Sequence, residues 1–194
     1  ISPTARKLCS LIWLCASSRS ISPLAKLFSN SLSLSCTFCK VTSEHKGFIP
    51  ASHGPYEMLV NLDLHIHSRY SMAVSADMLL PEIAREAAHK GVKIMATGDC
   101  LHPLWLDAIK KLPQSDGLFL LGDTCFVLSV EVEDARRVHH LIFLPDTAMA
   151  EQLQEGFAAY STNLSADGRP RLHMSGAEIA DLALEAGGMV GPAH

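Results

Sequence analysis

His65 and His67 are the residues of this chain with the clearest capacity for chemistry. They close the segment Asp63-Leu64-His65-Ile66-His67, which follows a short apolar run. Successive side chains of an extended strand point to opposite faces, so two imidazoles separated by one residue share a face. Both rings can then bind one metal ion. The spacing therefore indicates a metal-dependent hydrolase.

Ligand-type side chains recur near the ends of later apolar runs, as Asp99, Glu131, His139 and His194. Imidazole nitrogen and carboxylate oxygen suit Zn²⁺, Mn²⁺ or iron. The set is larger than one tetrahedral site requires, so we expect a cluster of two or three ions. Two ions about 3.5–4 Å apart can stabilise both the attacking and the leaving oxygen of a phosphoryl transfer.

Two overlapping sets of functional residues follow from this interpretation. The set expected to be catalytic comprises His65, His67, Asp99 and Glu131. The set expected to bind metal comprises His65, His67, Asp99, Glu131, His139 and His194.

Each of these residues also has a purely structural interpretation. An isolated H-x-H pair often faces solvent or caps a turn, and Asp99, after Thr97 and Gly98, is typical of a turn or helix cap. Glu131 lies in an apolar strand, where a carboxylate is costly unless it is paired or metal-bound. Several apolar runs supply ligand types together, and this favours the metal site over the separate structural explanations.

After Met58, residues that begin or end helices and strands recur at regular intervals, and they define the elements that would position these side chains. Pro81 is placed to open a helix that Gly91 closes. Thr147 is the expected N-cap of a later helix, and Ser175 with Glu178 forms a capping-box sequence. We expect strands at residues 59–65, 92–96, 126–132 and 138–144 and a buried strand from 189, with helices at 82–90, 104–112, 147–159 and 175–186.

Strands that alternate with helices favour parallel pairing and an α/β fold. Parallel α/β barrels place their active sites at the carboxyl ends of the strands, which is where the ligand-type residues fall. About five strands are recognisable, whereas a closed barrel of this kind has about seven or eight. We therefore interpret residues 58–194 as the N-terminal part of a barrel domain that is truncated at its C-terminal end.

Residues 1–57 differ from the rest in composition. They are rich in Ser and carry six Lys or Arg against two acids, a charge of +4. A secretory signal and an Arg- and Ser-rich transit peptide are two interpretations. A third is translated upstream sequence, because Met58 is the first methionine and strong patterning begins there. We expect the native protein to start at Met58 and residues 1–57 to be unstructured or non-native.

The six cysteines show no framework of a secreted disulfide scaffold. Cys36 and Cys39 have the spacing of half a zinc site, but no second ligand pair lies nearby. Only Cys100 and Cys125 fall in the patterned part, so a reducing, cytoplasmic compartment is expected. The early apolar run is shorter than the ~20 residues that a membrane span needs. No membrane partner is expected, and the oligomeric state stays open.

The motifs around these residues resemble the polymerase and histidinol phosphatase (PHP) superfamily. Its opening H-x-H strand is matched by residues 63–68, its strand glutamate by Glu131, and its later histidines by His139 and His194. Where the superfamily usually has Thr-Asp-His, Asp99 matches the acid and Cys100 replaces the histidine. That departure leaves the ligand set at this corner open.

Within the superfamily, the chain is most similar to endonuclease Q. The similarity runs from Leu59 to His194 in separate blocks and does not reach residues 1–57. The matching blocks are residues 65–75, 97–99, 102–105, 131–141, 167–171 and 191–194.

This resemblance implies a DNA repair endonuclease that cuts on the 5′ side of a deaminated base, such as uracil or hypoxanthine, or of an abasic site. It implies a distorted (β/α)7 barrel of TIM-like form with a trinuclear zinc centre, followed by a zinc-binding module and a helical region. Zinc, as two or three ions, is the expected cofactor, with manganese or magnesium as alternatives. The family's late Asp-x-His ligands and four-cysteine module are absent from this sequence. We therefore expect an incomplete barrel that does not hold the whole cluster and is inactive alone.

Damaged DNA is then the expected partner, and the charge of the chain bears on it. Residues 58–194 carry ten Lys or Arg against eighteen acids, a charge of −8. Affinity for nucleic acid comes largely from cations on phosphates, so bound metal ions would have to offset part of this charge. The expected phosphate contacts are Arg69, Arg136 and Arg137, with Arg169 and Arg171 as further candidates.

Two other functions stay open. The same metal residues and the acidic charge also suit a small-molecule phosphoesterase of the histidinol-phosphatase type. The incomplete barrel and Cys100 also suit an inactive PHP fragment.

Overall fold

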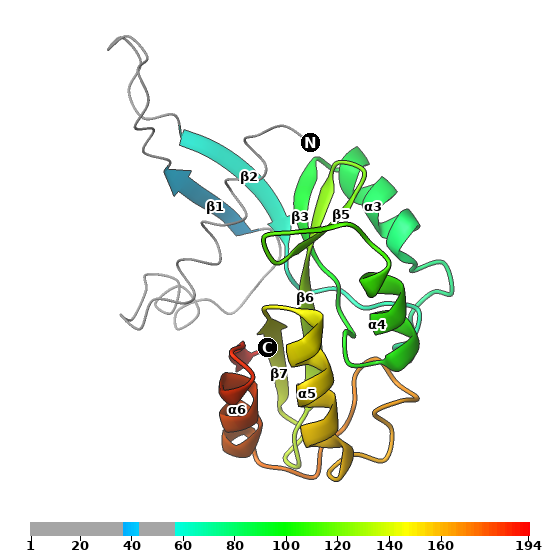
Figure 1. The fold of residues 1–194 in the computed structure, drawn as a ribbon, viewed down its shortest axis with the longest axis vertical. Coiled ribbons are helices and arrows are strands. Elements are labelled where there is room, and N and C mark those ends of the chain that lie inside the picture. Colours follow the sequence, from blue (N-terminus) through cyan, green and yellow to red (C-terminus); the bar gives the residue numbers. More distant parts are fainter. Residues whose placement is uncertain (1–36, 43–56) are drawn as a thin grey trace, which may run out of the picture.

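The computed structural model describes residues 37–42 and 57–194, and within these ranges it has a mixed α/β fold (Figure 1). The strands are β1 (Thr37–Thr42), β2 (Glu57–Asp63), β3 (Val92–Ala96), β4 (Gln114–Ser115), β5 (Leu118–Leu121), β6 (Thr124–Glu133), β7 (His139–Leu144) and β8 (Met189–Pro192). The helices are α3 (Leu80–His89), α4 (Pro103–Lys110), α5 (Thr147–Ala158) and α6 (Gly176–Glu185).

The long strand β6 organises the sheet. Its first half pairs parallel with β3 and antiparallel with β5, and its second half pairs antiparallel with β7. β2 lies parallel to β3 on one side, and β8 is antiparallel to β7 on the other. β1, from the segment that the sequence sets apart, is antiparallel to β2. The functional residues thus come from β6, from its neighbour β7 and from the ends of β2 and β8, each one strand further out.

The expectation of parallel pairing holds for β2, β3 and β6 but is wrong for β7 and β8. Only residues 134–138 separate β6 from β7, and a connection this short makes a hairpin rather than a parallel crossover. β4 and β5, joined by Asp116 and Gly117, form a second hairpin that the sequence analysis did not identify. The mixed α/β class is confirmed, and the (β/α)7 barrel stays a prediction.

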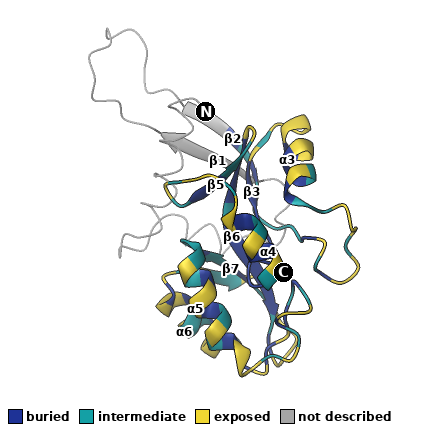
Figure 2. Ribbon diagram, turned by 45° about the vertical axis from the view of Figure 1, so that its right-hand side comes forward, coloured by how far each residue is buried: buried dark blue, intermediate teal, exposed yellow. Residues whose placement is uncertain are grey.

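The helices pack on the sheet through their apolar sides and leave their polar sides exposed (Figure 2). Trp105, Phe119, Phe126 and Phe157 are among the largest fully buried side chains of the described residues. They belong to one core cluster that joins all four helices to the centre of the sheet. This core holds β6 rigidly, and with it the residues that β6 presents.

The helix ends test the local predictions. Pro81 lies in the first turn of α3, and Ser175 and Glu178 form the predicted capping box of α6. Thr147 is not the cap of α5: the Asp146 side chain accepts from the Met149 N–H instead, which its carboxylate does better than a hydroxyl. β8 is partly exposed rather than buried, because it pairs only with β7 at the edge of the described sheet.

None of the helices in the described residues is long and apolar enough to cross a membrane.

Candidate metal centre

Glu131 is the centre of the candidate site. Its side chain is 2% exposed, in the second half of β6. Oε2 lies 3.3 Å from His65 Nε2 and 3.0 Å from His67 Nε2. Oε1 lies 2.6 Å from His139 Nδ1 and 3.9 Å from His194 Nδ1. One carboxylate therefore joins two groups of three ligands, one with His65 and His67 and the other with His139 and His194.

Separate elements bring these histidines to Glu131. His65 and His67 follow the end of β2, which stops at Asp63, two residues before the end of the predicted strand 59–65, and their rings lie 5.3 Å apart. His139 opens β7, where the antiparallel register sets it opposite Glu133. His194 follows β8, and its ring lies 4.9 Å from that of His139. The structure thus brings together five of the six predicted metal-binding residues.

Asp99, the sixth, lies behind His67 rather than in either group. Its Oδ1 is 3.2 Å from His67 Nδ1, and its Oδ2 accepts from the Ser68 N–H at 2.6 Å, the Ser68 hydroxyl at 2.6 Å and the Ser71 hydroxyl at 2.9 Å. This buried carboxylate fixes the orientation of the His67 ring, as partners of metal-binding histidines commonly do. A direct bond from Asp99 to a metal stays a prediction.

A close approach of two backbone segments sets this geometry. Gly98 has φ +60°, and a Cβ there would lie 2.3 Å from the Ile66 carbonyl oxygen. Only glycine lets the chain after β3 pass so near the segment that carries the two histidines. Asp99 follows with φ +50°, which turns its carboxylate toward His67.

Cys100 is buried in the core cluster. Burial raises the pKa of its thiol above the usual range, and the Asp99 charge adds to the effect. A thiol binds metal as the thiolate. Cys100 thus lies in the core cluster and belongs to neither of the two ligand groups.

The electrostatics of the group favour a cation. Burial lowers the pKa of His67, but hydrogen bonds to Asp99 and Glu131 outweigh it and raise that pKa to about 9. Burial raises the pKa of Glu131, yet its bonds to His65, His67 and His139 bring it well below the usual range. The Glu131 carboxylate is thus ionised, and the raised pKa of His67 shows that positive charge is favoured beside it, which a divalent ion can supply in place of a proton.

The donor set fits a metal on structural grounds as well. His65 Nε2 is buried, and its partner among the described residues is Glu131 Oε2 at 3.3 Å, an ion-pair contact without good hydrogen-bond geometry. A buried ring nitrogen that is poorly hydrogen-bonded is costly, and a metal ligand position would satisfy it. Nitrogen and carboxylate donors of this kind are the usual ligands of Zn²⁺ and Mn²⁺.

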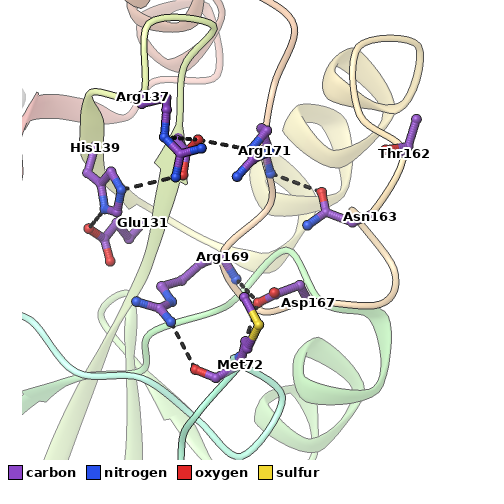
Figure 3. A pocket seen from close by; sticks show the side chains of 10 residues that line it. Met72, Glu131, Arg137, His139, Thr162, Asn163, Asp167, Arg169 and Arg171 are labelled. Carbon is purple, nitrogen blue, oxygen red and sulfur yellow. Dashed lines mark hydrogen bonds and ion pairs between the residues drawn. The ribbon is translucent and has the colours of Figure 1, made fainter.

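A pocket of about 430 Å³ opens beside Glu131 and His139 (Figure 3). Of the arginines predicted to contact phosphate, Arg137 lines it, with Arg169 and Arg171. Arg69 and Arg136 do not line it. The full lining is Met72, Glu131, Glu133, Arg137, His139, Thr162, Asn163, Asp167, Arg169 and Arg171.

Sequence reasoning missed several residues that support the site. Ser68 and Ser71 hold Asp99, and Asn163 accepts from the Arg171 N–H. His102 is buried and stacks on Tyr70, with ring centroids 4.2 Å apart. The two serines fall inside the block 65–75 that resembles endonuclease Q, and that block was the one available signal for them.

No family model matches this chain. An uncharacterized protein of Methanocaldococcus jannaschii is 41% identical over 137 residues, which are 71% of this chain and 16% of that protein. Among solved structures, the lesion-specific endonuclease PfuEndoQ from Pyrococcus furiosus is 45% identical, with a TM-score of 0.68 over 71% of this chain and 35% of that one. A structure of endonuclease Q with a 27-mer duplex substrate, with an abasic lesion at the active site, matches equally well.

The predicted resemblance to endonuclease Q is thereby confirmed over 71% of the chain. The chain spans about a sixth of the curated relative and about a third of the solved structures that it matches.

Proposed function

We propose that this chain belongs to a metal-dependent DNA repair endonuclease that hydrolyses the phosphodiester bond on the 5′ side of a deaminated base or an abasic site. One observation carries the proposal. Two ligand groups meet at Glu131 in a chain 45% identical to a lesion-specific endonuclease.

The residues that would hold the ions are His65 and His67 on one side of Glu131, and His139 and His194 on the other. When bound, such ions lower the pKa of a water molecule and offset the charge that develops on the phosphate. Zinc suits these donors well, and manganese and magnesium are the alternatives. We infer that His65, His67, Asp99 and Glu131 form the catalytic group.

The chain's own residues contribute orientation and charge. Asp99, held by two serines, keeps Nδ1 of His67 engaged, so Nε2 of the same ring faces Glu131. Burial in β6 keeps Glu131 in one position and away from bulk water. Positioned groups of this kind cost little reorganisation during the reaction. Recognition of a damaged base would require its extrusion from the duplex toward the pocket.

The test is strand cleavage by the intact protein. Duplexes with one uracil, hypoxanthine or abasic site are incubated with Zn²⁺, Mn²⁺ or Mg²⁺, beside an undamaged duplex. We expect a metal-dependent nick 5′ of the lesion, abolished by His65→Ala. His89→Ala is the matched control, since His89 is exposed on α3. Absence of nicking with all three metals would refute the proposal.

The charge of −8 over residues 58–194 favours a second candidate, a phosphoesterase for small substrates. That enzyme would hydrolyse a phosphomonoester such as p-nitrophenyl phosphate and leave lesion-containing DNA intact. The same protein preparations distinguish the two functions.

A further inference from the structure

The pocket beside Glu131 is lined by three arginines that the proposed hydrolysis does not account for, together with three acids. Arg137, Arg169 and Arg171 all line it, next to Glu131 and His139 of the candidate metal centre (Figure 3). They come from two segments, the turn between β6 and β7 and the chain that leads to α6. Tertiary structure brings them to one pocket, so their proximity could not be predicted from the local sequence.

The segment with Arg169 and Arg171 is fixed to the end of β6. The Glu133 N–H donates to the Pro170 carbonyl at 3.0 Å, and the Leu172 N–H donates to the Glu133 carbonyl at 2.8 Å. Both arginines therefore have defined positions beside the strand that carries Glu131.

The acids that line the pocket are already engaged. Asp167 accepts from the backbone N–H of Met72 and of Arg169, at 3.4 and 3.0 Å. Glu133 lies 2.9 Å from Arg171 Nε. Arg169 donates to the Met72 carbonyl at 2.9 Å, and within residues 57–194 no carboxylate lies at ion-pair distance from it. The guanidinium groups keep donors that can receive an anion.

Arg137 is held in a costly backbone conformation. Its φ is +67°, in the left-handed region that favours glycine. Asp134 builds this turn, accepting from the N–H of Arg136 and Val138 at 2.8 and 2.9 Å. The Arg137 side chain is 72% exposed and 3.7 Å from Glu133, so little packing compensates for the strain. Residues kept in strained conformations cluster at functional sites.

We propose that this pocket binds a phosphodiester of DNA that neighbours the scissile phosphodiester. Arg137 is then a positioning residue, with Arg169 and Arg171 beside it. The inference rests on the proposed function. Guanidinium matches phosphate geometry better than an ammonium does. A small phosphate ester carries the same chemistry, and the experiment separates the two sources.

Arg137 and Arg136 form a matched pair for the test. They are neighbours of equal charge in one turn, but only Arg137 lines the pocket. Binding of the intact, metal-loaded protein to a nicked abasic-site duplex, the expected product, is followed by fluorescence anisotropy at several salt concentrations. We expect Arg137→Ala to weaken binding about tenfold and to reduce the salt slope by about one. Arg136→Ala should change affinity less than about twofold.

Arg137→Gly separates the contact from folding. Glycine adopts left-handed φ without strain, so the thermal midpoint of Arg137→Gly should lie above that of the wild type. Its affinity for DNA should fall as in Arg137→Ala. If Arg137 had only a structural role, a variant with higher stability would not lose affinity for DNA.

Three outcomes decide the inference. Equal losses from Arg136→Ala and Arg137→Ala would overturn it. So would a loss confined to p-nitrophenyl phosphate, measured as its hydrolysis by the same protein preparations, with duplex binding intact. If the wild type fails to nick damaged DNA but Arg137→Ala still selectively loses duplex affinity, the phosphate pocket stands and the proposed endonuclease function fails.

Discussion

Glu131 is the residue on which the whole candidate centre depends. Each of its oxygens faces a different pair of histidines, so it belongs to both candidate ligand groups. Without that carboxylate, the two pairs of histidines would have no shared ligand and no negative charge to balance an ion. Substitution of this one side chain should therefore affect every ion at once.

Glu131→Gln tests that dependence with almost no change in volume. We expect the purified protein to lose most of its bound metal, measured by elemental analysis, and nicking of lesion DNA to fall more than about 100-fold. Glu155→Gln, at an exposed position of α5, should keep both properties. Retention of full metal content by Glu131→Gln would contradict the assignment of Glu131 as the shared ligand.

Asp99 is placed to set the tautomer of His67, since its Oδ1 lies 3.2 Å from Nδ1. With metal bound, a carboxylate there would accept the Nδ1 proton and leave the Nε2 lone pair for the ion. In Asp99→Asn, the amide oxygen takes the serine donors, and the amide NH₂ turns to Nδ1, which moves the ring proton to Nε2. We expect zinc affinity, measured by competition with a chelating dye, to fall about 10–100-fold.

The number of ions distinguishes a supporting role from direct ligation. With excess zinc, Asp99→Asn should still bind as many ions as the wild type if Asp99 only orients His67. Loss of one ion at saturation would show instead that Asp99 is itself a ligand. Asp107→Asn, on the exposed side of α4, is the control.

At this scale the sequence predicts which residues are of a metal-ligand type, but not which of them bind metal directly and which support a ligand. His65, His67, Glu131 and His194 were identifiable because each is a ligand type near the end of an apolar run, whereas His139 is one at the start of a run. The position of Asp99 behind His67 and the different environments of Arg136 and Arg137 depend on contacts between distant segments. Spacing along the chain carries no information about these contacts.

At the scale of elements, the crossing of β3 and the His-x-His segment is the critical junction. Gly98 provides it, since its missing side chain leaves room for the Ile66 carbonyl. Helix and strand positions were largely predictable from hydrophobic period, capping residues, Pro and Gly. The antiparallel pairing of β7 and β8 was not, because it depends on the short turn after β6 and on tertiary partners.

Gly98→Ala and Gly122→Ala test the junction as a matched pair. Both glycines have left-handed φ, +60° and +59°, but an added Cβ at Gly122 meets nothing within 4 Å. Gly122→Ala should lower the free energy of unfolding by about 1 kcal/mol from backbone strain alone. Gly98→Ala adds a clash with backbone, for a total of about 3 kcal/mol. Urea unfolding measures both.

Metal binding supplies the second readout for this pair. Gly98→Ala displaces His65 and His67 from Glu131, so its zinc affinity should fall as well, whereas Gly122→Ala should bind zinc as the wild type does. Equal unfolding energies and equal zinc affinities in the two variants would mean that the close approach to Ile66 is not maintained in solution.

At the scale of the whole molecule, the candidate centre collects ligands from four strands of the sheet at one place. Its ligands follow β2, lie in β6, open β7 and follow β8. An ion that binds the folded chain and not the unfolded one stabilises it by mass action, about 4 kcal/mol at a concentration 1,000 times the Kd. For a chain of this size, each kcal/mol shifts the thermal midpoint by about 2–4 °C.

Chelation should therefore lower the midpoint of thermal unfolding by about 8–16 °C relative to the zinc-loaded protein. Unfolding followed by circular dichroism, with zinc and then with EDTA, measures the shift. Glu131→Gln gives the internal control, because a variant without the shared ligand should unfold at the same temperature in both conditions. An equal EDTA effect on the wild type and Glu131→Gln would place the stabilising metal elsewhere, and the convergence of four strands on one centre would lose its energetic basis.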